Sequence, residues 1–455
     1  MPLFWLPTPR ASRIMFPEMI FTRRVFAGIL AQIPFPNKPS IPSAPSIPST
    51  PNIPSQPSTP SKPTIPWPKK KAKKKSNKGF VRADGKTLVD PEGKRLTLRG
   101  INLGNWLEPE GYMFLFEEGP QSPREVEGFF NELIGPHEAD LFWRDYRKRF
   151  ITDADIQFIK QCGLNSVRIP FHYQYFVNGG EGFELLDPVI EWCSKAGIWV
   201  ILDMHCAPGG QTGTNIDDSW GYPWLYESEE AQDLTCQVWK GIADYYSDET
   251  TIIGYDLLNE PIPTFPQLQK YNSKLEPLYK RITHAIREVD KDHLIILEGA
   301  QWATNFQVFG SPFDAKTIYE FHKYWAEPNQ DAIREYLEFR DRHNVPIWLG
   351  ESGENTDQWV GQFAELVNKN DVGWCFWPYK KMEKTSCLVS MAKPAHWDEI
   401  IAFGKMAGGT GAAEKRIAAR PSLESSREAL HDLLEKIEFR ACSVNHGYLQ
   451  ALGLH

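Results

Sequence analysis

Residues 187–205 have the sequence DPVIEWCSKAGIWVILDMH, in which a helix-like segment runs directly into a strand-like one. Residues 187–197 space their apolar side chains at helical intervals and end on a glycine, a common helix stop. Residues 198–205 form a mainly apolar run of strand length that ends on His205. Because such a run is typical of a strand buried on both faces, this pair of segments predicts a parallel sheet covered by helices.

The same alternation of strand-like and helix-like segments extends along most of the chain. Helix-like patterns occupy residues 151–163, 229–246 and 331–343, and Thr152 is a suitable cap for the first of them. Seven further strand-like runs occupy residues 96–105, 165–170, 252–260, 293–299, 317–325, 346–353 and 372–380. Eight strands that alternate with helices predict an α/β fold of the closed (β/α)8 barrel type.

An open, doubly wound parallel sheet is the alternative fold that this alternation allows. Such a sheet normally has a glycine-rich turn of the form G-x-G-x-x-G after its first strand, and GINLGN at residues 100–105 lacks that spacing. We therefore favour the barrel. A helix-like segment at residues 427–437 follows a small glycine-rich break at residues 408–413, and we expect it to belong to the outer ring of helices.

The first 78 residues differ in composition from the rest of the chain. Residues 22–32, TRRVFAGILAQ, place two arginines before a short apolar run, which predicts a targeting segment at 1–35 and a secreted or cell-envelope location. From residue 36 to residue 66 every third residue is proline, the period of a polyproline II helix. We therefore predict a disordered, Pro-rich and Lys-rich linker at 36–78, followed by a single barrel domain at 79–455.

Charge and cysteine content exclude several classes of function. Seven lysines and no acid lie in residues 69–78, whereas the whole chain has a formal net charge of −8, so the barrel domain is acidic and a nucleic-acid-binding core is not expected. We expect the lysine run to be a solvated collar, with adhesion to an acidic polymer or an anionic surface as the alternative. No segment approaches the roughly 18 apolar residues of a membrane span. The seven cysteines lack the spacing of a zinc site, so no metal is expected.

Polar and aromatic side chains gather where the predicted strands end. In a (β/α)8 barrel these ends meet on one face, where such folds carry their chemistry. The residues concerned are Asn105, Trp106, Glu108, Arg168, His172, His205, Asn259, Glu260, His322, Tyr324, Glu351 and Trp377. Glu260 and Glu351 end strands four and seven, on opposite sides of the barrel, and Arg168 is available to keep one of them ionised. Two carboxyl groups across a cleft with aromatic walls predict glycoside hydrolysis.

Several of these residues lie in short motifs. The motifs are VRIP (167–170), LLNEP (257–261), H-x-Y (322–324) and WLGESG (348–353), together with RGINLGNWLEPE (99–110) and DMHCAPGGQ (203–211). In this order they resemble glycoside hydrolase family 5, a family of retaining (β/α)8 enzymes that includes cellulases and exo-1,3-glucanases. The resemblance implies a β-glucan-type polysaccharide or oligosaccharide as the substrate, with β-1,3 or β-1,4 linkages. It also implies a monomer that needs neither metal nor cofactor.

The resemblance also implies roles for the residues at the reacting centre. Glu260 would be the general acid/base and Glu351 the nucleophile of a double displacement that uses two glutamates. Asn259 would hold the 2-hydroxyl of the sugar, and Arg168 would orient the nucleophile.

A second set of residues would surround the sugar. His205 would line the subsite on the non-reducing side, His322 would lie beside the acid/base, Tyr324 beside the nucleophile, and Trp377 under the sugar ring. Glu108 would be a further substrate contact, although its spacing from the first-strand tryptophan departs from that of the exo-acting members. The sequence FWPYKKM at 376–382 also departs from the familiar members, and it leaves the preferred sugar open.

Three rival functions remain to be weighed. A carbohydrate-binding protein on the same barrel without catalysis predicts that one of the two glutamates is missing, and both are present. A metal-dependent hydrolase requires a His-x-His or carboxylated-lysine pattern on the early strands, which the sequence lacks. An interaction protein built around the proline-rich segment leaves the remainder of the chain unexplained. The linkage, the sugar, and the choice between endo and exo action stay open.

Overall fold

The computed structural model describes residues 65, 67, 79–177, 180–406 and 413–455. The predicted targeting segment, most of the proline-rich segment, the lysine run and the glycine-rich break therefore lie outside the described residues. The described residues from Ile65 onward belong to one compact unit, Pro63–His455.

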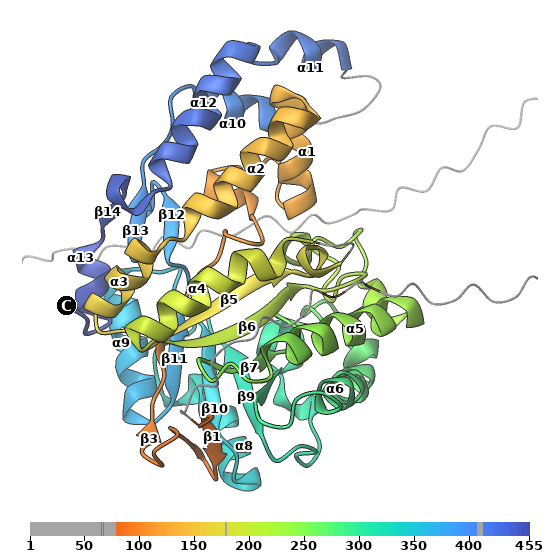
Figure 1. The fold of residues 1–455 in the computed structure, drawn as a ribbon, viewed down its shortest axis with the longest axis vertical. Helices are drawn as coiled ribbons and strands as arrows, with labels where there is room; N and C mark the ends of the chain where they lie inside the picture. The colour runs from red at the N-terminus through yellow and green to blue at the C-terminus, as the bar shows by residue number, and fades with distance from the viewer. Residues whose placement is uncertain (1–64, 66, 68–78, 178–179, 407–412) are drawn as a thin grey trace, which may run out of the picture. The chain divides into compact units, whose positions relative to one another are not determined.

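Within the described residues, eight parallel strands form a closed barrel with the neighbour order β10-β11-β4-β5-β6-β7-β8-β9 (Figure 1). The strands are β4 (Arg99–Asn102), β5 (Ser166–His172), β6 (Trp199–Cys206), β7 (Ile252–Asp256), β8 (Leu294–Glu298), β9 (Thr317–His322), β10 (Ile347–Glu351) and β11 (Gly373–Phe376). Each of the eight predicted runs overlaps one of them, although β5 extends two residues and β6 one residue beyond the predicted end. The barrel confirms the predicted fold and excludes the open sheet.

The helices that follow the strands surround the barrel, and several are bounded by residues that commonly cap helices. They are α3 (Asp153–Gln161), α4 (Gly182–Ala196), α5 (Glu229–Tyr246), α6 (Asn272–Arg287), α8 (Arg334–His343) and α9 (Asp357–Lys369), with the single turn α7 (Ala300–Ala303) after β8. Thr152 caps α3 in a reciprocal capping box with Asp155, as its position predicted. Their apolar faces pack against the strands in one continuous core.

The final helices do not form part of the ring that surrounds the barrel, which differs from our expectation for residues 427–437. Helix α12 (Leu423–Lys436) packs against α1 (Pro123–Ile134) and α2 (Pro136–Phe150), which are inserted between β4 and α3. With α10 (Trp397–Gly404) and α11 (Ala413–Ala419) they form a layer beside the barrel, at the top of Figure 1. The reason is an aromatic face on the insertion, whose Phe129 and Phe130 contact rings of α10.

Two small sheets complete the described chain. Strands β12 (Lys380–Met382), β13 (Val389–Met391) and β14 (Ser443–Val444) connect the end of the barrel to the last helix, α13 (His446–Ala451). Strands β1 (Arg82–Asp84), β2 (Thr87–Val89) and β3 (Arg95–Leu96) cover the end of the barrel where the strands begin, and Leu88 packs there against Trp348.

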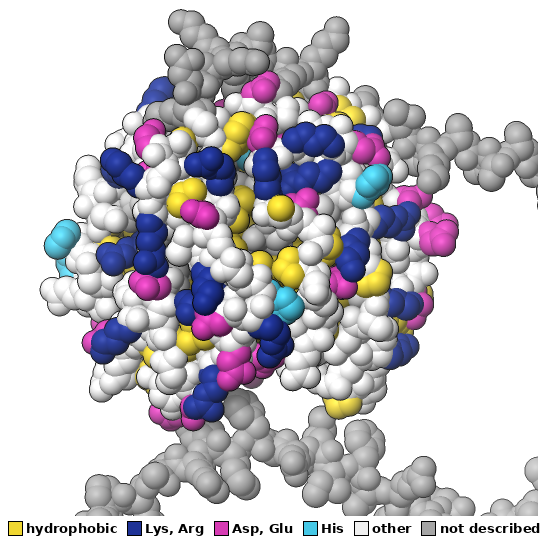
Figure 2. All heavy atoms as spheres, turned by 90° about the horizontal axis from the view of Figure 1, so that it is seen from below, with side chains coloured by type: hydrophobic (Ala, Val, Ile, Leu, Met, Phe, Trp, Pro, Cys, Tyr) yellow, Lys and Arg dark blue, Asp and Glu magenta, His cyan; other side chains and the backbone are white. Residues whose placement is uncertain are grey.

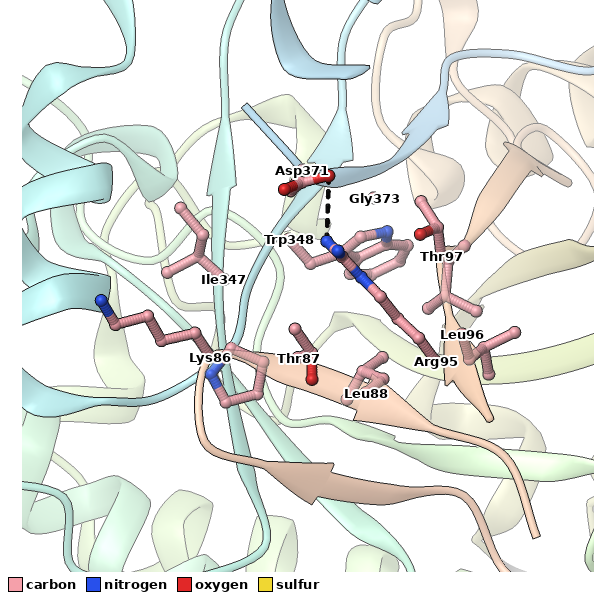
Figure 3. A pocket seen from close by; sticks show the side chains of 12 residues that line it. Lys86, Thr87, Leu88, Arg95, Leu96, Thr97, Ile347, Trp348, Asp371 and Gly373 are labelled. Carbon is pink, nitrogen blue, oxygen red and sulfur yellow. Dashed lines mark ion pairs between the residues drawn. The ribbon is translucent and has the colours of Figure 1, made fainter. Parts of the chain in front are cut away.

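A small hollow lies beneath β1–β3, at the end of the barrel where the strands begin. The Arg95 guanidinium bridges it with a 3.0 Å ion pair to Asp371, and the Trp348 indole forms part of its wall (Figure 3). The hollow has a volume of about 20 Å³, which is the space of a single water molecule. A sugar therefore does not fit there.

The described surface carries charges of both signs. Figure 2 shows acidic and basic side chains interspersed over one face of the molecule, without a broad field of one sign. None of the helices in the described ranges combines the length and apolarity needed to cross a membrane.

Two residues of the predicted linker contact the barrel domain. Ile65 and Trp67 pack against its core. The Trp67 ring lies edge-on to Phe183 of α4, with 6.3 Å between centroids, and it covers Gly241 of α5 so closely that a Cβ there would lie 2.4 Å from the indole. The barrel therefore holds a socket for the residue that follows the last proline of the repeat.

Candidate active site

A cavity of about 700 Å³ opens at the carboxyl ends of the barrel strands, and its size suits a small sugar ligand. Most of its wall comes from strand ends and the loops that follow them. The lining residues are Glu110, Tyr112, His205, Asn215, Ile216, Glu260, Trp302, Thr304, His322, Lys323, Tyr324, Trp325, Ala326, Glu351, Glu354 and Trp377. Six of the nine predicted site residues line the cavity, namely His205, Glu260, His322, Tyr324, Glu351 and Trp377, whereas Arg168, Asn259 and Glu108 do not.

Glu351, the last residue of β10, is fixed by two donors. Arg168 Nη1 donates to its Oε1 at 2.6 Å, and the Tyr324 hydroxyl donates to its Oε2 at 3.0 Å. The pairing of β9 with β10 shifts register at this point, so that Glu351 lies beside His322. The carboxylate is therefore held with both oxygens engaged at the cavity wall.

Glu260 follows β7 and has an unusual backbone. Its φ angle is 45°, in the left-handed region that non-glycine residues rarely adopt. Its backbone N–H donates to Glu298 Oε2 at 2.7 Å, and its Oε1 lies 3.0 Å from His322 Nδ1. Burial raises the pKa of Glu260 to about 7, although His205 and Arg168 oppose the shift. A carboxyl with such a pKa holds a proton near neutral pH and releases it readily.

Glu260 and Glu351 approach each other across His322. One carboxylate oxygen of each glutamate and one ring nitrogen of His322 all lie within 4.8 Å of one another. Burial lowers the pKa of His322 to about 3, so the ring is neutral, and its Nε2 lies 3.1 Å from Glu320 Oε1. His322 Nδ1 therefore lies 3.0 Å from Glu260 and 3.6 Å from Glu351 without adding a positive charge.

Asn259 and His205 form a second hydrogen-bonded pair beside Arg168. The Asn259 Oδ1 accepts from Arg168 Nη2 at 3.0 Å, and its Nδ2 lies 3.2 Å from His205 Nε2. Burial lowers the pKa of His205 to about 4, and its Nδ1 lies 2.8 Å from Asp203 Oδ2. A neutral ring that donates from Nδ1 to Asp203 leaves Nε2 to accept from Asn259.

Trp377 follows β11 and forms an apolar floor. Its indole stacks on His205, with centroids 5.6 Å apart and planes 12° apart, and its Nε1 donates to the Tyr112 hydroxyl at 2.7 Å. The Trp377–Pro378 peptide bond is cis. The flat indole face suits the apolar face of a sugar ring.

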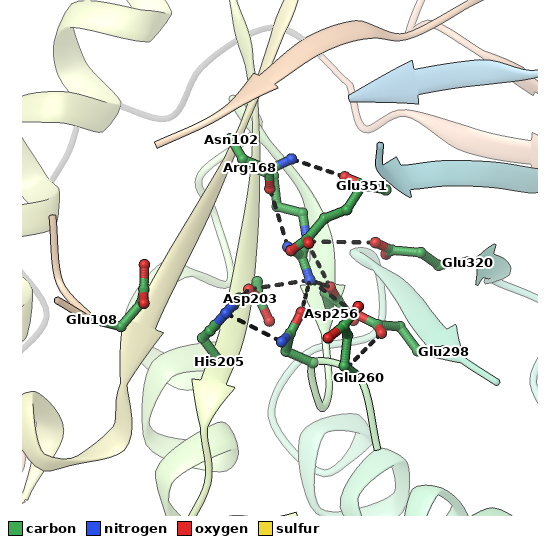
Figure 4. Close-up of polar contacts among 12 residues, drawn as sticks. Asn102, Glu108, Arg168, Asp203, His205, Asp256, Glu260, Glu298, Glu320 and Glu351 are labelled. Atoms are coloured by element: carbon green, nitrogen blue, oxygen red, sulfur yellow. Dashed lines mark hydrogen bonds and ion pairs between the residues drawn. The ribbon is translucent and has the colours of Figure 1, made fainter. Parts of the chain in front are cut away.

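A layer of carboxylates beneath the cavity surrounds the Arg168 guanidinium (Figure 4). Five carboxylates lie within 3.5 Å of it, those of Asp203, Asp256, Glu298, Glu320 and Glu351. Burial raises the pKa of Asp203 to about 7 and that of Asp256 to about 6. Burial also holds the pKa values of Glu298 and Glu320 well above their usual range. One guanidinium does not neutralise five carboxylates, so the layer retains protons.

Glu108 lies away from the position that the sequence suggests. Its Oε1 accepts from the backbone N–H of Asn105 at 2.7 Å, and its Oε2 has no partner among the described residues. Figure 4 shows it apart from the cluster around Arg168. Glu110, two residues later, lines the cavity instead, and both residues follow a left-handed backbone position at Asn105 (φ 65°).

The remaining polar strand-end residues have structural contacts. Trp106 is buried and donates from Nε1 to the Arg147 carbonyl at 2.7 Å. His172 is buried beside Asp218, with 3.1 Å between Nε2 and Oδ2. Neither residue lines the cavity.

The sequence FWPYKKM at 376–382, which differs from the familiar family members, supplies some residues to the packed core and others to the cavity wall or its supports. The Tyr379 hydroxyl donates to Asp155, and the buried Lys380 pairs with the same carboxylate. Lys381 pairs with Glu354 and lies over the Tyr112 ring, 4.5 Å from its centroid. Lys381 therefore supports two residues of the cavity wall.

Sequence reasoning missed two tryptophans at the mouth of the cavity. Trp325 follows β9, is 73% exposed, and donates from Nε1 to the Glu354 carbonyl at 3.2 Å. Trp302 follows β8 and contacts Phe265 edge-on, with 6.3 Å between centroids. Both have left-handed backbones, with φ angles of 51° and 60°. An exposed tryptophan held in a strained loop next to a polar cavity is a common ligand platform.

Four groups of three acidic or histidine side chains in the described residues lie close enough to share a metal ion. Glu108, Glu110 and His205 form one group, and Glu260, His322 and Glu351 form another. The second group is hydrogen-bonded internally and to neighbouring residues. Proximity alone does not identify a metal site, and we assign none.

Comparisons with known proteins identify the family of the chain. The chain matches the family model described as cellulase (glycosyl hydrolase family 5) over residues 129–383. It is 31% identical over 354 residues to a beta-xylosidase from Phanerodontia chrysosporium, covering 66% of this chain and 71% of the relative. It is 25% identical over 315 residues to endoglucanase C from Acetivibrio thermocellus, covering 54% and 89%. The solved rutinosidase from Aspergillus niger has a TM-score of 0.52 at 19% identity, covering 64% and 92%, which concerns the fold alone.

Proposed function

The chain belongs to glycosyl hydrolase family 5, whose members hydrolyse O-glycosyl bonds, and from this premise we propose a retaining β-glycosidase that uses two glutamates. The proposed substrate is a β-glucan-type polysaccharide or oligosaccharide with β-1,3 or β-1,4 linkages. Glu351 is the proposed nucleophile and Glu260 the proposed acid/base.

The observation that carries the proposal is the closeness of the two glutamates. Their nearest carboxylate oxygens lie within 4.8 Å of each other. Retaining glycosidases hold their two carboxyl groups about 5 to 5.5 Å apart, whereas inverting enzymes need roughly 6.5 to 9.5 Å to admit a water molecule. The separation therefore favours direct attack by Glu351 over attack by water.

In the first step, a Glu351 oxygen forms a bond to the anomeric carbon while the bond from that carbon to the leaving oxygen breaks. Glu260 gives its proton to the leaving oxygen, for which a pKa of about 7 is well suited. In the second step, Glu260 takes a proton from water, and the water oxygen displaces Glu351 from the anomeric carbon. Two inversions leave the β configuration unchanged.

The walls of the cavity suggest where the parts of the substrate lie. On one side the chain after β4 is packed inside the protein, and Glu110 is only 4% exposed. On the other side the wall ends in the exposed Trp325 and the half-buried Trp302. We therefore place the terminal sugar on Trp377, with the leaving group toward the two tryptophans, and propose exo action.

A panel of substrates with products resolved by size tests both linkage and mode. Laminarin, cellulose, lichenan and glucomannan cover the glucan linkages, and aryl β-xylosides are included because one relative is a beta-xylosidase. Exo action predicts a single small sugar as the first product. A ladder of longer products would contradict the proposed placement.

Covalent trapping tests the roles of the glutamates independently of the substrate. A 2-deoxy-2-fluoro-β-glycoside of the accepted sugar should leave its sugar on Glu351, as a peptide mass shift. A label on another residue, or inverted stereochemistry in the product, would overturn the proposal. Stoichiometric sugar binding without turnover would instead favour the non-catalytic carbohydrate-binding protein.

We also propose an export and spacer role for the N-terminal residues. Residues 1–35 would direct secretion, residues 36–78 would space the barrel domain, and the lysine run would be a solvated collar, with adhesion to an acidic surface as its alternative. N-terminal sequencing of protein recovered from the culture medium tests the first point. Light scattering tests the expected monomer.

A further inference from the structure

Glu298, at the end of β8, contacts the supports of both catalytic glutamates. It is fully buried, and its backbone carbonyl accepts from the Tyr279 hydroxyl at 3.0 Å. Its Oε1 accepts from Arg168 Nη2 at 2.9 Å, and its Oε2 accepts from the backbone N–H of Glu260 at 2.7 Å. One carboxylate therefore lies between Arg168 and the main chain of Glu260 (Figure 4).

The contact with Glu260 fixes a strained backbone. A left-handed conformation is strained for a non-glycine residue, and a residue before proline is restricted further. Glu260 has a φ angle of 45° and precedes Pro261. The angle φ describes rotation about the N–Cα bond. The hydrogen bond from the Glu260 N–H to Glu298 restrains that rotation, and so it restrains the direction in which the Glu260 side chain points.

The contact with Arg168 reaches the other glutamate. The guanidinium is planar and rigid, so its position is set by all its partners together. Glu298 holds Nη2, and Nη1 of the same group donates to Glu351 Oε1 at 2.6 Å. A shift of Glu298 therefore moves the support of Glu351 as well as that of Glu260.

We propose that Glu298 is a positioning residue that sets the distance and angle between the acid/base and the nucleophile. This inference rests on the roles proposed above for Glu260 and Glu351. Glu298 does not line the cavity, so it acts through Glu260 and Arg168 and not on the sugar. The alternative is that Glu298 has a structural role only, as one of the five carboxyl groups around Arg168, and does not position Glu260.

The variant Glu298→Gln tests the inference, because it keeps the shape of the side chain and replaces one accepting oxygen with a donor. A misplaced acid matters only where the leaving group needs a proton. On alkyl glycosides or natural glycans, kcat/KM should fall about tenfold or more. On 2,4-dinitrophenyl glycosides, which leave without a proton, only the change passed through Arg168 to Glu351 remains, so the loss in the first step should be several-fold smaller than on the natural substrates.

Asp256→Asn is the matched control. Asp256 Oδ2 accepts from the same Arg168 Nη2 at 2.7 Å, and its side chain also hydrogen-bonds with Glu298, whereas within the described residues it makes no hydrogen bond or ion pair with Glu260. Its substitution removes a carboxylate from the same guanidinium without releasing the Glu260 backbone. The control should lose activity by the same factor on both classes of substrate.

Glu298→Asp provides a second variant if the glutamine variant does not fold. It keeps a carboxyl group beside Arg168 but shortens the side chain, which withdraws an oxygen from the Glu260 N–H, so it should show the same dependence on the leaving group. Equal losses on both substrate classes, as in the Asp256 control, would leave Glu298 with a structural role only.

Glu260→Ala, measured in parallel, distinguishes a failure of the proposed acid/base role of Glu260 from a failure of the proposed positioning role of Glu298. If Glu260→Ala shows no leaving-group dependence, the proposed acid/base role itself is wrong. If Glu260→Ala shows the dependence and the Glu298 variants do not, only the inference about Glu298 fails.

Discussion

Arg168 Nη1 lies 2.6 Å from Glu351 Oε1, which joins β5 to β10 through the interior of the barrel. Arg168 is fully buried and Glu351 lines the cavity, so the ion pair links the acidic layer to the site where a sugar would bind. The same guanidinium contacts Asn259 and Glu298, which adjoin Glu260. Arg168 is therefore the common support of the proposed catalytic pair.

The first prediction is that Glu351→Gln abolishes turnover and leaves the fold intact. The amide cannot attack the anomeric carbon, and the change removes no volume from the core. We expect kcat to fall by about 10⁴-fold or more while the melting temperature changes by only a few degrees. Activity near that of the unchanged enzyme in a folded variant would rule out Glu351 as the nucleophile.

The second prediction concerns pH. The first step needs a protonated Glu260, and its pKa of about 7 means that the acid form is lost as pH rises through neutrality. On substrates with poor leaving groups, kcat/KM should therefore fall tenfold per pH unit well above about pH 7. The matched measurement uses 2,4-dinitrophenyl glycosides, on which this alkaline fall should be weak. An alkaline fall of equal steepness on both substrates would assign it to another group.

The third prediction is that Glu320→Gln stabilises the fold at alkaline pH. Burial, followed by the charge of Asp256, holds the pKa of Glu320 well above its usual range, although Arg168 opposes this. The folded state thus binds this proton more tightly than the unfolded state does, so the contribution of Glu320 to stability falls as pH rises above about 4. We expect the variant to gain about 1 kcal/mol in free energy of unfolding at about pH 8 and little at about pH 4.

Asp290 provides the control of opposite sign for that measurement. Burial raises its pKa, but the hydrogen bond and charge of His293 together with hydrogen bonds from Asp292 and Tyr255 outweigh this and lower the pKa to about 2. Its contribution to stability is therefore present above the unfolded pKa, and Asp290→Asn should lose about 1 to 3 kcal/mol at about pH 8. A Glu320 variant that also loses stability there would show that its carboxylate is a favourable partner of Arg168.

Most of the site residues that could be predicted from the sequence lie at the ends of the predicted strands. The positions of Glu260 and Glu351 follow from strand boundaries, because an apolar run that stops on a carboxylate marks both the element and its exposed end. Asp256, Glu298 and Glu320 escaped attention because they lie inside or at the end of runs that were otherwise explained by burial. A carboxylate within a strand that is buried on both faces is a pattern that could have found them.

The lining of the cavity after β4 and the layer of final helices depend on three-dimensional contacts that the spacing of apolar residues does not reveal. Glu110 lines the cavity and Glu108 does not, and both follow a left-handed backbone position at Asn105 that strand periodicity does not predict. The layer of α10, α11 and α12 beside the barrel depends on contacts with α1 and α2, which are far away in the sequence. Helical periodicity identifies an apolar face but not the element that covers it.

The fourth prediction concerns the socket for Trp67. Gly241→Ala places a Cβ 2.4 Å from the Trp67 indole, so the ring must leave and the fold should lose about 1 kcal/mol or more. In a Trp67→Ala background the same change meets no indole, and alanine is favoured over glycine inside a helix by about 1 kcal/mol. The sign of the effect of Gly241→Ala should therefore reverse between the two backgrounds, as measured by denaturant unfolding. Equal effects in both would show that Trp67 does not occupy the socket in solution.

The fifth prediction concerns Glu260→Ala and separates the two steps of the proposed mechanism. Without an acid, natural glycans should lose most of their turnover, whereas 2,4-dinitrophenyl glycosides still transfer their sugar to Glu351 because their leaving group needs no proton. Hydrolysis of the glycosyl-enzyme then lacks its base, so the intermediate should accumulate and be visible by mass spectrometry.

Azide provides the decisive measurement on that variant, because it attacks the anomeric carbon without giving up a proton. Added azide should restore turnover of the 2,4-dinitrophenyl glycoside and give a β-glycosyl azide, since a second inversion at the anomeric carbon returns the original configuration. The unchanged enzyme serves as the control, because its own base already activates water and azide should not accelerate it. An α-glycosyl azide would mean a single displacement by an inverting enzyme. Loss of activity on both substrates without rescue would mean that Glu260 supports the fold and does not transfer the proton.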